Sequence, residues 1–150
     1  FEKFWSPSLS FALKRKMTDN KKILVLVTGA SGFIAGHIMQ QLCEQGYQVR
    51  ATVRRFDKSS HEYLLDLAKR PNQIEFVNCD LTSDENWDKA MKGVKYVIHT
   101  ASPMPNTETG EKGKGTKRPI TDDDYIIPAV DGMNRVLNAI LNHGKSVERM

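Results

Sequence analysis

The stretch from Ile23 to Arg55, ILVLVTGASGFIAGHIMQQLCEQGYQVRATVRR, decides the fold. It begins with an uninterrupted apolar run, 23–27, which is typical of a strand buried on both faces of a parallel sheet. A turn of small residues follows, and then apolar residues recur at helical spacing until Gly46, a good C-terminal capping residue. Alternating apolar and polar residues at 49–54 predict a second strand. Strand, glycine-rich turn, helix and strand together form a βαβ unit of the kind that binds dinucleotides.

Small residues occupy the turn after the first strand, and their positions suit the binding of an anion. Gly29 permits the backbone angles of a tight turn, and Gly32 has no side chain to keep a pyrophosphate away from the backbone. The anion would then lie on free N–H groups at the positive end of the following helix. Ala35 is small enough for the helix to pack closely on the strand. The spacing is GxxGxxA, which differs from the common GxGxxG and gains its meaning from the strand and helix that flank it.

Further alternation of helices and strands is predicted over the rest of the chain. Capping-box pairs, Ser59 with Glu62 and Thr82 with Glu85, open two of the helices. In chain order the predicted segments are a helix from Ser59 to before Pro71, a strand at 74–77, a short helix after Thr82, a strand at 94–100, a helix at 126–141 with Pro128 in its first turn and Gly144 at its end, and the start of a strand at 147–150. The sequence therefore predicts an α/β fold, a doubly wound parallel sheet (Rossmann fold) that is truncated after the start of the fifth strand.

The composition is that of one globular domain. The chain has 150 residues, of which 39% are apolar and 27% charged. No apolar run approaches the roughly 20 residues of a membrane span, so we expect a soluble protein that does not enter a membrane. Two cysteines, Cys43 in a helix and Cys79 at a strand end, indicate inert thiols in a reducing compartment and no metal site. We therefore expect a cytoplasmic protein.

The first residues do not fit this pattern. Residues 1–16 are basic, contain serine and have one acidic residue, which is compatible with the end of a transit peptide, with untranslated sequence or with a short extension. We predict a non-structural leader at 1–16 and the domain itself at 17–150. The leader contributes +3 of the formal net charge of +4. The domain is then nearly neutral, and its charge gives no argument for nucleic-acid binding.

Five motifs carry a resemblance to a known family. They are TGASGFIA, GYQVRATVRR, CDL, YVIHTASP and PAVDGMNRVLNAI. In this order they resemble the extended short-chain dehydrogenase/reductases of the NAD-dependent epimerase/dehydratase superfamily, and among these the dihydroflavonol reductases, cinnamoyl-CoA reductases and related aldehyde or ketone reductases. The resemblance runs from about Lys22 to Met150, except for the long loop described below. It implies an oxidoreductase that transfers a hydride from NADPH to a small-molecule carbonyl substrate.

Basic residues end the second strand at the position that selects the cofactor. NAD-binding folds usually have an acidic residue there for the ribose 2′-OH, whereas arginine accommodates the 2′-phosphate of NADP. Arg54 and Arg55 occupy this position, and Lys58 is a second candidate. Asp57 is a contrary signal, and a solvated basic turn is the alternative interpretation. The pattern favours NADP(H).

The resemblance also implies roles for residues at three turns. The glycine turn would bind the cofactor, and Asp80 with Leu81 would face the adenine, although a plain acidic turn before a helix is the alternative for that pair. The turn after the strand at 94–100 would lie along the nicotinamide ribose. His99 in that strand is interpreted as a hydrogen-bonded core residue without a catalytic role. The residues that the resemblance assigns to the cofactor are Gly29, Ser31, Gly32, Phe33, Ile34, Arg54, Lys58, Asp80, Leu81, Thr100, Ala101 and Ser102.

A long irregular stretch at 104–124 departs from the resembling family. It carries a basic cluster, Lys112, Lys114, Lys117 and Arg118. Such loops are usually lids or disordered insertions. A solvated insertion and a basic lid over an anionic substrate are both open.

Catalytic residues are not expected within these residues. The resembling reductases use a serine and a Tyr-x-x-x-Lys pair, in which the lysine helps the tyrosine to protonate the carbonyl oxygen. No Tyr-x-x-x-Lys occurs in the 150 residues, and both groups would follow Met150. We therefore expect the chain to be the amino-terminal fragment of an NADP-dependent reductase, inactive by itself. Two alternatives stay open: a sugar-nucleotide epimerase or dehydratase with bound NAD, and a non-catalytic dinucleotide-sensing protein.

Overall fold

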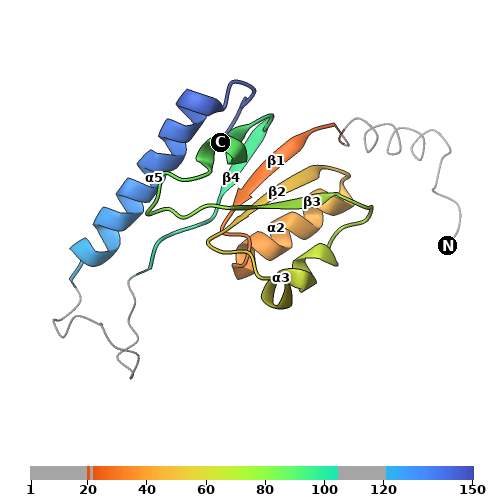
Figure 1. Ribbon diagram of the computed structural model, residues 1–150, viewed down its shortest axis with the longest axis horizontal. Coiled ribbons are helices and arrows are strands. Elements are labelled where there is room, and N and C mark those ends of the chain that lie inside the picture. Colours follow the sequence, from red (N-terminus) through yellow and green to blue (C-terminus); the bar gives the residue numbers. More distant parts are fainter. Residues whose placement is uncertain (1–19, 21, 105–120) are drawn as a thin grey trace, which may run out of the picture.

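The computed structural model describes residue 20 and residues 22–104 and 121–150. Its centre is a four-stranded sheet in the order β3-β2-β1-β4, and all three neighbouring pairs are parallel (Figure 1). The strands are β1 (Leu24–Thr28), β2 (Gln48–Val53), β3 (Ile74–Asn78) and β4 (Tyr96–His99). The helices that alternate with them are α2 (Phe33–Glu44), α3 (Lys58–Leu65), α4 (Trp87–Met91) and α5 (Asp123–His143). The predicted α/β fold with a doubly wound parallel sheet is confirmed.

The apolar run of β1 is buried on both faces of the sheet, because its side chains point alternately to opposite sides. Val25 and Val27 belong to a cluster with residues of α2 and α3, whereas Leu26 belongs to a second cluster with residues of α4 and α5. Figure 1 shows the same division, with α2 and α3 on one side of the sheet and α4 and α5 on the other. The three side chains are at most 1% exposed. The carboxyl ends of the strands therefore form one edge between two helical layers.

The chain begins to add a further strand beside β4. Tyr96 and Arg149 form a parallel bridge, in which the Val97 N–H donates to the Arg149 carbonyl at 3.0 Å. The Glu148 N–H donates to the Lys95 carbonyl at 2.9 Å. The predicted strand start at 147–150 is thus confirmed as the beginning of parallel pairing.

Helix α3 is capped two residues earlier than the predicted capping box. Asp57, not Ser59, is the N-cap, and its carboxylate accepts from the Ser60 N–H at 3.2 Å. The Ser59 hydroxyl donates to the same carboxylate at 2.6 Å. The ionised carboxylate is the stronger acceptor and takes the capping position.

Helix α4 also lacks its predicted cap. It begins at Trp87 after Asn86, whose backbone is left-handed with φ 64°. Thr82 is instead bound to Asp80, which accepts from the Thr82 N–H at 2.8 Å and from the Thr82 hydroxyl at 2.7 Å. The Thr82–Glu85 capping box was therefore wrong, because a nearby carboxylate takes the hydroxyl proton.

Helix α5 begins at Asp123, three residues before the predicted start at Ile126. Pro128 therefore lies inside the helix and not in its first turn. Acidic residues Asp123 and Asp124 form that first turn, where the helix dipole favours negative charge. The predicted start was late because it relied on the apolar stripe alone.

The remaining predictions concern the end of α2, the two cysteines, and the segments 1–16 and 104–124. Gly46, with φ 89°, follows the C-cap of α2 as expected for a left-handed capping position. Cys43 and Cys79 are free and buried, and burial raises the pKa of Cys43 to about 11 and of Cys79 to about 12. The leader at 1–16 and the basic cluster of the 104–124 loop lie outside the described residues. Within the described ranges, no helix has the length and apolar character that crossing a bilayer requires.

Candidate functional site

The glycine turn after β1 lies against the turn after β4. Gly29 has φ +68°, and a Cβ placed on it would lie 2.9 Å from the Cα of Ala101. The turn is also tied to β2, because Thr52 accepts from the Ala30 N–H at 2.9 Å through its carbonyl and from the Gly29 N–H at 3.3 Å through its hydroxyl. A side chain at Gly29 would therefore meet both a strained backbone and a neighbouring main chain.

The amino end of α2 opens onto this turn. Gly32 is the N-cap in an extended conformation, and no side chain caps the helix. The first helical hydrogen bond runs from the Gly36 N–H to the Gly32 carbonyl at 3.0 Å. The N–H groups of Phe33, Ile34 and Ala35 consequently have no acceptor within the helix. Together with the helix dipole they can hold one phosphate of a dinucleotide.

Two predicted site residues flank this helix end with exposed apolar side chains. Phe33 is 83% exposed and Ile34 is 66% exposed. Ser31, in the turn itself, is also exposed. The first turn of α2 carries no acidic residue that would repel an anion. The glycine turn thus places its five predicted residues around one set of backbone donors.

Thr28, at the end of β1, organises the turn after β4. Its Oγ1 accepts from the N–H groups of Thr100 at 3.1 Å and Ala101 at 3.2 Å. The Thr100 hydroxyl in turn donates to the Thr28 carbonyl at 2.6 Å. These bonds hold the predicted nicotinamide-side segment, Thr100 to Ser102, beside the glycine turn.

His99 is fixed in one neutral form by the same hydroxyl. Thr28 Oγ1 lies 2.7 Å from His99 Nδ1. Because Oγ1 already accepts two N–H bonds, its single proton points to Nδ1, and the ring proton of His99 is on Nε2. Burial lowers the pKa of His99. The interpretation of His99 as a hydrogen-bonded core residue agrees with these contacts.

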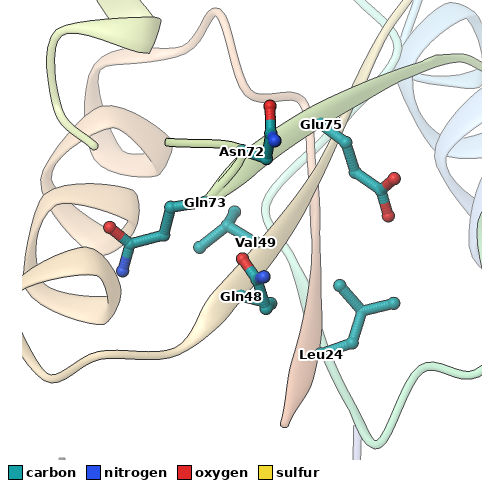
Figure 2. A pocket seen from close by; sticks show the side chains of 6 residues that line it. All are labelled: Leu24, Gln48, Val49, Asn72, Gln73 and Glu75. Carbon is teal, nitrogen blue, oxygen red and sulfur yellow. The ribbon is translucent and has the colours of Figure 1, made fainter. Parts of the chain in front are cut away.

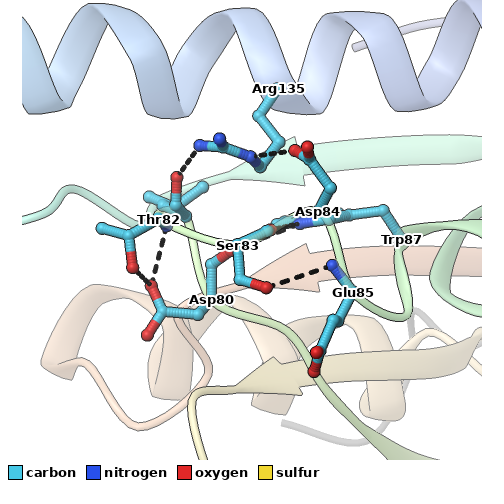
Figure 3. A network of polar contacts seen from close by, with 8 residues as sticks. Asp80, Thr82, Ser83, Asp84, Glu85, Trp87 and Arg135 are labelled. Atoms are coloured by element: carbon cyan, nitrogen blue, oxygen red, sulfur yellow. Dashed lines mark hydrogen bonds and ion pairs between the residues drawn. The ribbon is translucent and has the colours of Figure 1, made fainter.

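The turn after β3 is a compact polar network (Figure 3). The two bonds that Asp80 accepts from Thr82 are the main cause of its lowered pKa, and the charges of Arg54 and Arg135 lower it further. The indole N–H of Trp87 donates to the carbonyls of Asp80 at 3.3 Å and Ser83 at 3.0 Å. Asp80 is therefore an ionised, fixed acceptor at the carboxyl edge. Its neighbour Leu81 is 8% exposed and packs mainly in the core beneath.

Arg54 and Lys58 lie near the end of β2 with their charged groups in solvent. Lys58 is 76% exposed and has Glu62 at 4.0 Å. Asp57, the contrary signal in the sequence, has its carboxylate committed to the cap of α3 and to Ser59. These bonds to Ser59 and Ser60 lower the pKa of Asp57. The first acidic side chain after β2 is thus a helix cap.

A cavity of about 240 Å³ lies elsewhere, at the amino ends of the strands (Figure 2). It is lined by Leu24, Gln48, Val49, Asn72, Gln73 and Glu75. The glycine turn and the turns after β3 and β4 lie at the opposite edge of the sheet. We place the candidate site at that carboxyl edge, where ligands of open α/β sheets bind. In the described part of the chain, no cluster of His, Cys, Asp and Glu could hold a metal ion.

Three residues of this edge were not found from the sequence. Thr28 and Thr52 hold the glycine turn, and Arg135 reaches the turn after β3 from α5. A polar residue that closes an apolar strand, as Thr28 does, is a usable signal. Arg135 gives no local signal, because its partners are more than 50 positions away in the chain.

The chain is similar to a known family and to known proteins over much of its length. The family model described as NAD dependent epimerase/dehydratase family matches residues 25–147. The bifunctional dihydroflavonol 4-reductase/flavanone 4-reductase of Malus domestica is 35% identical over 116 residues, which cover 77% of this chain and 30% of that protein. A protein of Mycosarcoma maydis, named as a fatty acid hydroxylase, is 43% identical over 89 residues, which cover 59% of this chain and 29% of that protein.

Solved structures agree with this fold. Yeast methylglyoxal/isovaleraldehyde reductase Gre2, complexed with NADPH, has a TM-score of 0.62 and 30% identity, and the match covers 85% of this chain and 35% of that chain. The chain therefore spans 29% to 35% of the length of the proteins that it matches here.

Proposed function

Because the chain belongs to the NAD-dependent epimerase/dehydratase family, we propose that it forms the cofactor-binding part of a reductase that uses NADPH to reduce a small-molecule carbonyl compound. The proposal is supported by the reductases among its relatives and by a neighbour of known structure that carries NADPH. Aldehydes, ketones and dihydroflavonol-like compounds are the substrate classes to examine first.

The residues at the carboxyl edge fit the parts of a dinucleotide. The pyrophosphate would lie on the N–H groups of Phe33 and Ile34, in the space that Gly32 leaves open. The adenosine half would extend over the ends of β2 and β3, toward Asp80 and Leu81. The nicotinamide ribose would lie along the segment from Thr100 to Ser102. When bound there, NADPH supplies the hydride, and this chain supplies the phosphate donors and the orientation.

The single observation that favours NADPH over NADH is the charge pattern after β2. Arg54 is exposed directly after the last residue of β2, and its positive charge contributes to the lowered pKa of Asp80 in the turn after β3. The carboxylate of Asp57, which could have held a 2′-OH, is bonded within the cap of α3. A guanidinium suits the 2′-phosphate dianion. Lys58 would add a second positive charge.

Proton transfer to the carbonyl oxygen would come from residues outside this chain. Neither of the exposed tyrosines of the described residues, Tyr63 and Tyr125, has a lysine four positions later. His99 is half-buried, burial lowers its pKa, and its Nδ1 is bonded to the Thr28 hydroxyl, which makes it a poor proton donor. The chain therefore binds and orients the cofactor, and the full-length protein completes the site.

Kinetic assay of the full-length protein tests the proposal. Oxidation of NADPH should be followed with a panel of aldehydes, ketones and dihydroflavonols, and with a sugar nucleotide as a negative control. We expect turnover with at least one carbonyl class and none with the sugar nucleotide. Epimerisation of the sugar nucleotide without net NADPH oxidation would contradict the proposal and favour the epimerase alternative.

A further inference from the structure

Arg135 links α5 to the turn that follows β3. Its guanidinium donates to the carbonyl of Leu81 and to the carboxylate of Asp84, so one side chain binds both halves of the turn (Figure 3). The Arg135 side chain is 23% exposed and the Asp84 side chain 89%. The planar fork of arginine can satisfy two acceptors in different directions at once.

Helix α5 can approach the turn because of a glycine one helical turn before Arg135. A Cβ on Gly132 would lie 3.2 Å from the Cβ of Leu81 and 3.4 Å from the Cγ of Pro103. The helix thus contacts the turn after β3 and the segment after β4 at one point. Residues three apart lie on the same helix face, so Gly132 and Arg135 both face Leu81.

The remaining hydrogen bonds of this turn are local. Thr82 donates to Asp80, the Ser83 N–H donates to the Asp80 carbonyl at 3.2 Å, and the Trp87 indole donates to the carbonyls of Asp80 and Ser83. They shape the turn and tie it to Trp87 at the start of α4, but they do not reach α5. Arg135 supplies the side-chain hydrogen bonds from α5, beside the packing of Leu81 against Gly132.

The position of the turn assigns it to one half of the cofactor. In the strand order β3-β2-β1-β4, the end of β4 lies on one side of the glycine turn, and the ends of β2 and β3 lie on the other. A dinucleotide with its pyrophosphate on α2 and its 2′-phosphate at Arg54 would place its adenosine over the ends of β2 and β3. The Asp80–Asp84 turn would then form the wall of the adenosine site.

We infer that Arg135 is a positioning residue that holds the Asp80–Asp84 turn in place for the adenosine half of NADPH. The inference rests on the proposed function for the identity of the ligand, but the attachment itself is independent of any cofactor. Arg135 does not touch the reacting atoms. Its loss should therefore weaken cofactor binding and leave the chemical step unchanged.

The test uses the full-length protein with Arg135→Met and Arg135→Lys, and Asn138→Met as the control at an exposed position of the same helix. Hydrogen exchange of the Asp80–Asp84 amides is measured without cofactor. Affinity for 2′,5′-ADP, and kcat and KM for NADPH, are measured alongside.

We expect Arg135→Met to accelerate exchange in the turn and to raise the KM for NADPH and the Kd for 2′,5′-ADP about tenfold, with kcat nearly unchanged. Arg135→Lys should give exchange rates, KM and Kd between those of the wild type and Arg135→Met. Asn138→Met should give the wild-type values.

The outcomes separate this inference from the proposed function. Unchanged exchange in the turn of Arg135→Met would overturn the inference, whatever the cofactor does. A fall in kcat equal to the rise in KM would also overturn it, because positioning of the adenosine half should not alter the chemical step. If Arg135→Met does not fold, Arg135→Lys decides the test. Cofactor affinity and exchange in the turn that both equal the wild-type values would then overturn the inference. If Arg135→Met accelerates exchange in the turn but the wild-type protein does not bind NADPH, the result supports the attachment and overturns the proposed function.

Discussion

Gly29 and Gly32 share the glycine turn, but they are required for different reasons. Gly29 has φ +68° and lies against the backbone of Ala101, so any side chain there is strained and crowded. Gly32 has the extended φ −77° and ψ 151°, which other residues also adopt. A Cβ on it would lie 3.2 Å from the Gly29 carbonyl. A glycine is thus needed at position 29 for the backbone to fold. A glycine at position 32 keeps the space at the amino end of α2 open.

Gly32→Val should therefore abolish NADPH binding and leave the secondary structure largely intact. The branched side chain would occupy the space through which the pyrophosphate reaches the N–H groups of α2. Circular dichroism and a cofactor titration of the full-length protein measure both effects. Tight binding that persists in the variant would show that the turn does not hold the phosphates.

Arg54→Ala should remove most of the preference for NADPH over NADH. The lost guanidinium would cost roughly tenfold to a hundredfold in NADPH affinity, as charge-assisted bonds to a phosphate do. NADH affinity should stay near the wild-type value. Titration of both cofactors checks this, with Lys22→Ala as a control at the opposite edge of the sheet. An unchanged affinity ratio would exclude Arg54 as the 2′-phosphate residue.

His99 should make stability sensitive to mild acid. Burial lowers the pKa of His99 in the folded state, whereas in the unfolded chain its pKa is about 6.5. As pH falls through that value, the unfolded state binds a proton that the folded state refuses, so stability decreases until the lowered pKa is reached. Urea unfolding on both sides of pH 6.5 measures this. His99→Gln should flatten the dependence in this window, and an equally steep dependence in the variant would refute the assignment.

At the scale of elements, the helices differ in what defines their ends. Apolar periodicity in the sequence was enough to predict each strand and each helix, because burial on one or two faces decides the element type. The predicted caps of α3 and α4 failed instead because a nearby carboxylate competes with a hydroxyl, and α5 begins with an acidic turn that precedes its apolar stripe. Asp57 takes the cap of α3, and Asp80 takes the hydroxyl of Thr82. Pattern rules do not rank such competitors, which explains the errors at these helix starts.

Gly36→Ala should stabilise α2, whereas Gly29→Ala should destabilise the domain. A Cβ on Gly36 would meet nothing within 4 Å, so the change gains helix propensity of about 1 kcal/mol. Gly29→Ala would hold a non-glycine residue at positive φ against Ala101, at a cost of roughly 1–3 kcal/mol. Thermal unfolding of the two full-length variants gives the comparison. The account would be wrong if both substitutions shifted Tm in the same direction.

At the scale of the whole molecule, the site is assembled from segments that are distant in sequence. Thr28 binds Thr100 and Ala101 across more than 70 positions, and Arg135 reaches Leu81 across 54. The sequence located the glycine turn and the basic end of β2, because each is a local pattern. Thr28 has a local signal, a polar residue that closes an apolar strand, but its partners and the role of Arg135 exist only when the strands and α5 are brought together.

The exposed face of α5 bears on how the 150-residue chain behaves by itself. Its large apolar side chains are 43% to 81% exposed at Ile126, Ile127, Val130, Leu137 and Leu141. We expect this chain, expressed alone, to aggregate and to show no reductase activity, because it contains no Tyr-x-x-x-Lys sequence. Light scattering and an NADPH oxidation assay test both points. A cooperative monomeric melt with measurable turnover would mean that the working unit is smaller than we propose.

Direct titration of the full-length wild-type protein with NADPH and with NADH tests the central claim. The account predicts saturable binding of NADPH at one site per chain, at least about tenfold tighter than binding of NADH, because the proposal places Arg54 and Lys58 beside the 2′-phosphate. Equal affinity for the two cofactors, or tighter binding of NADH, would contradict it.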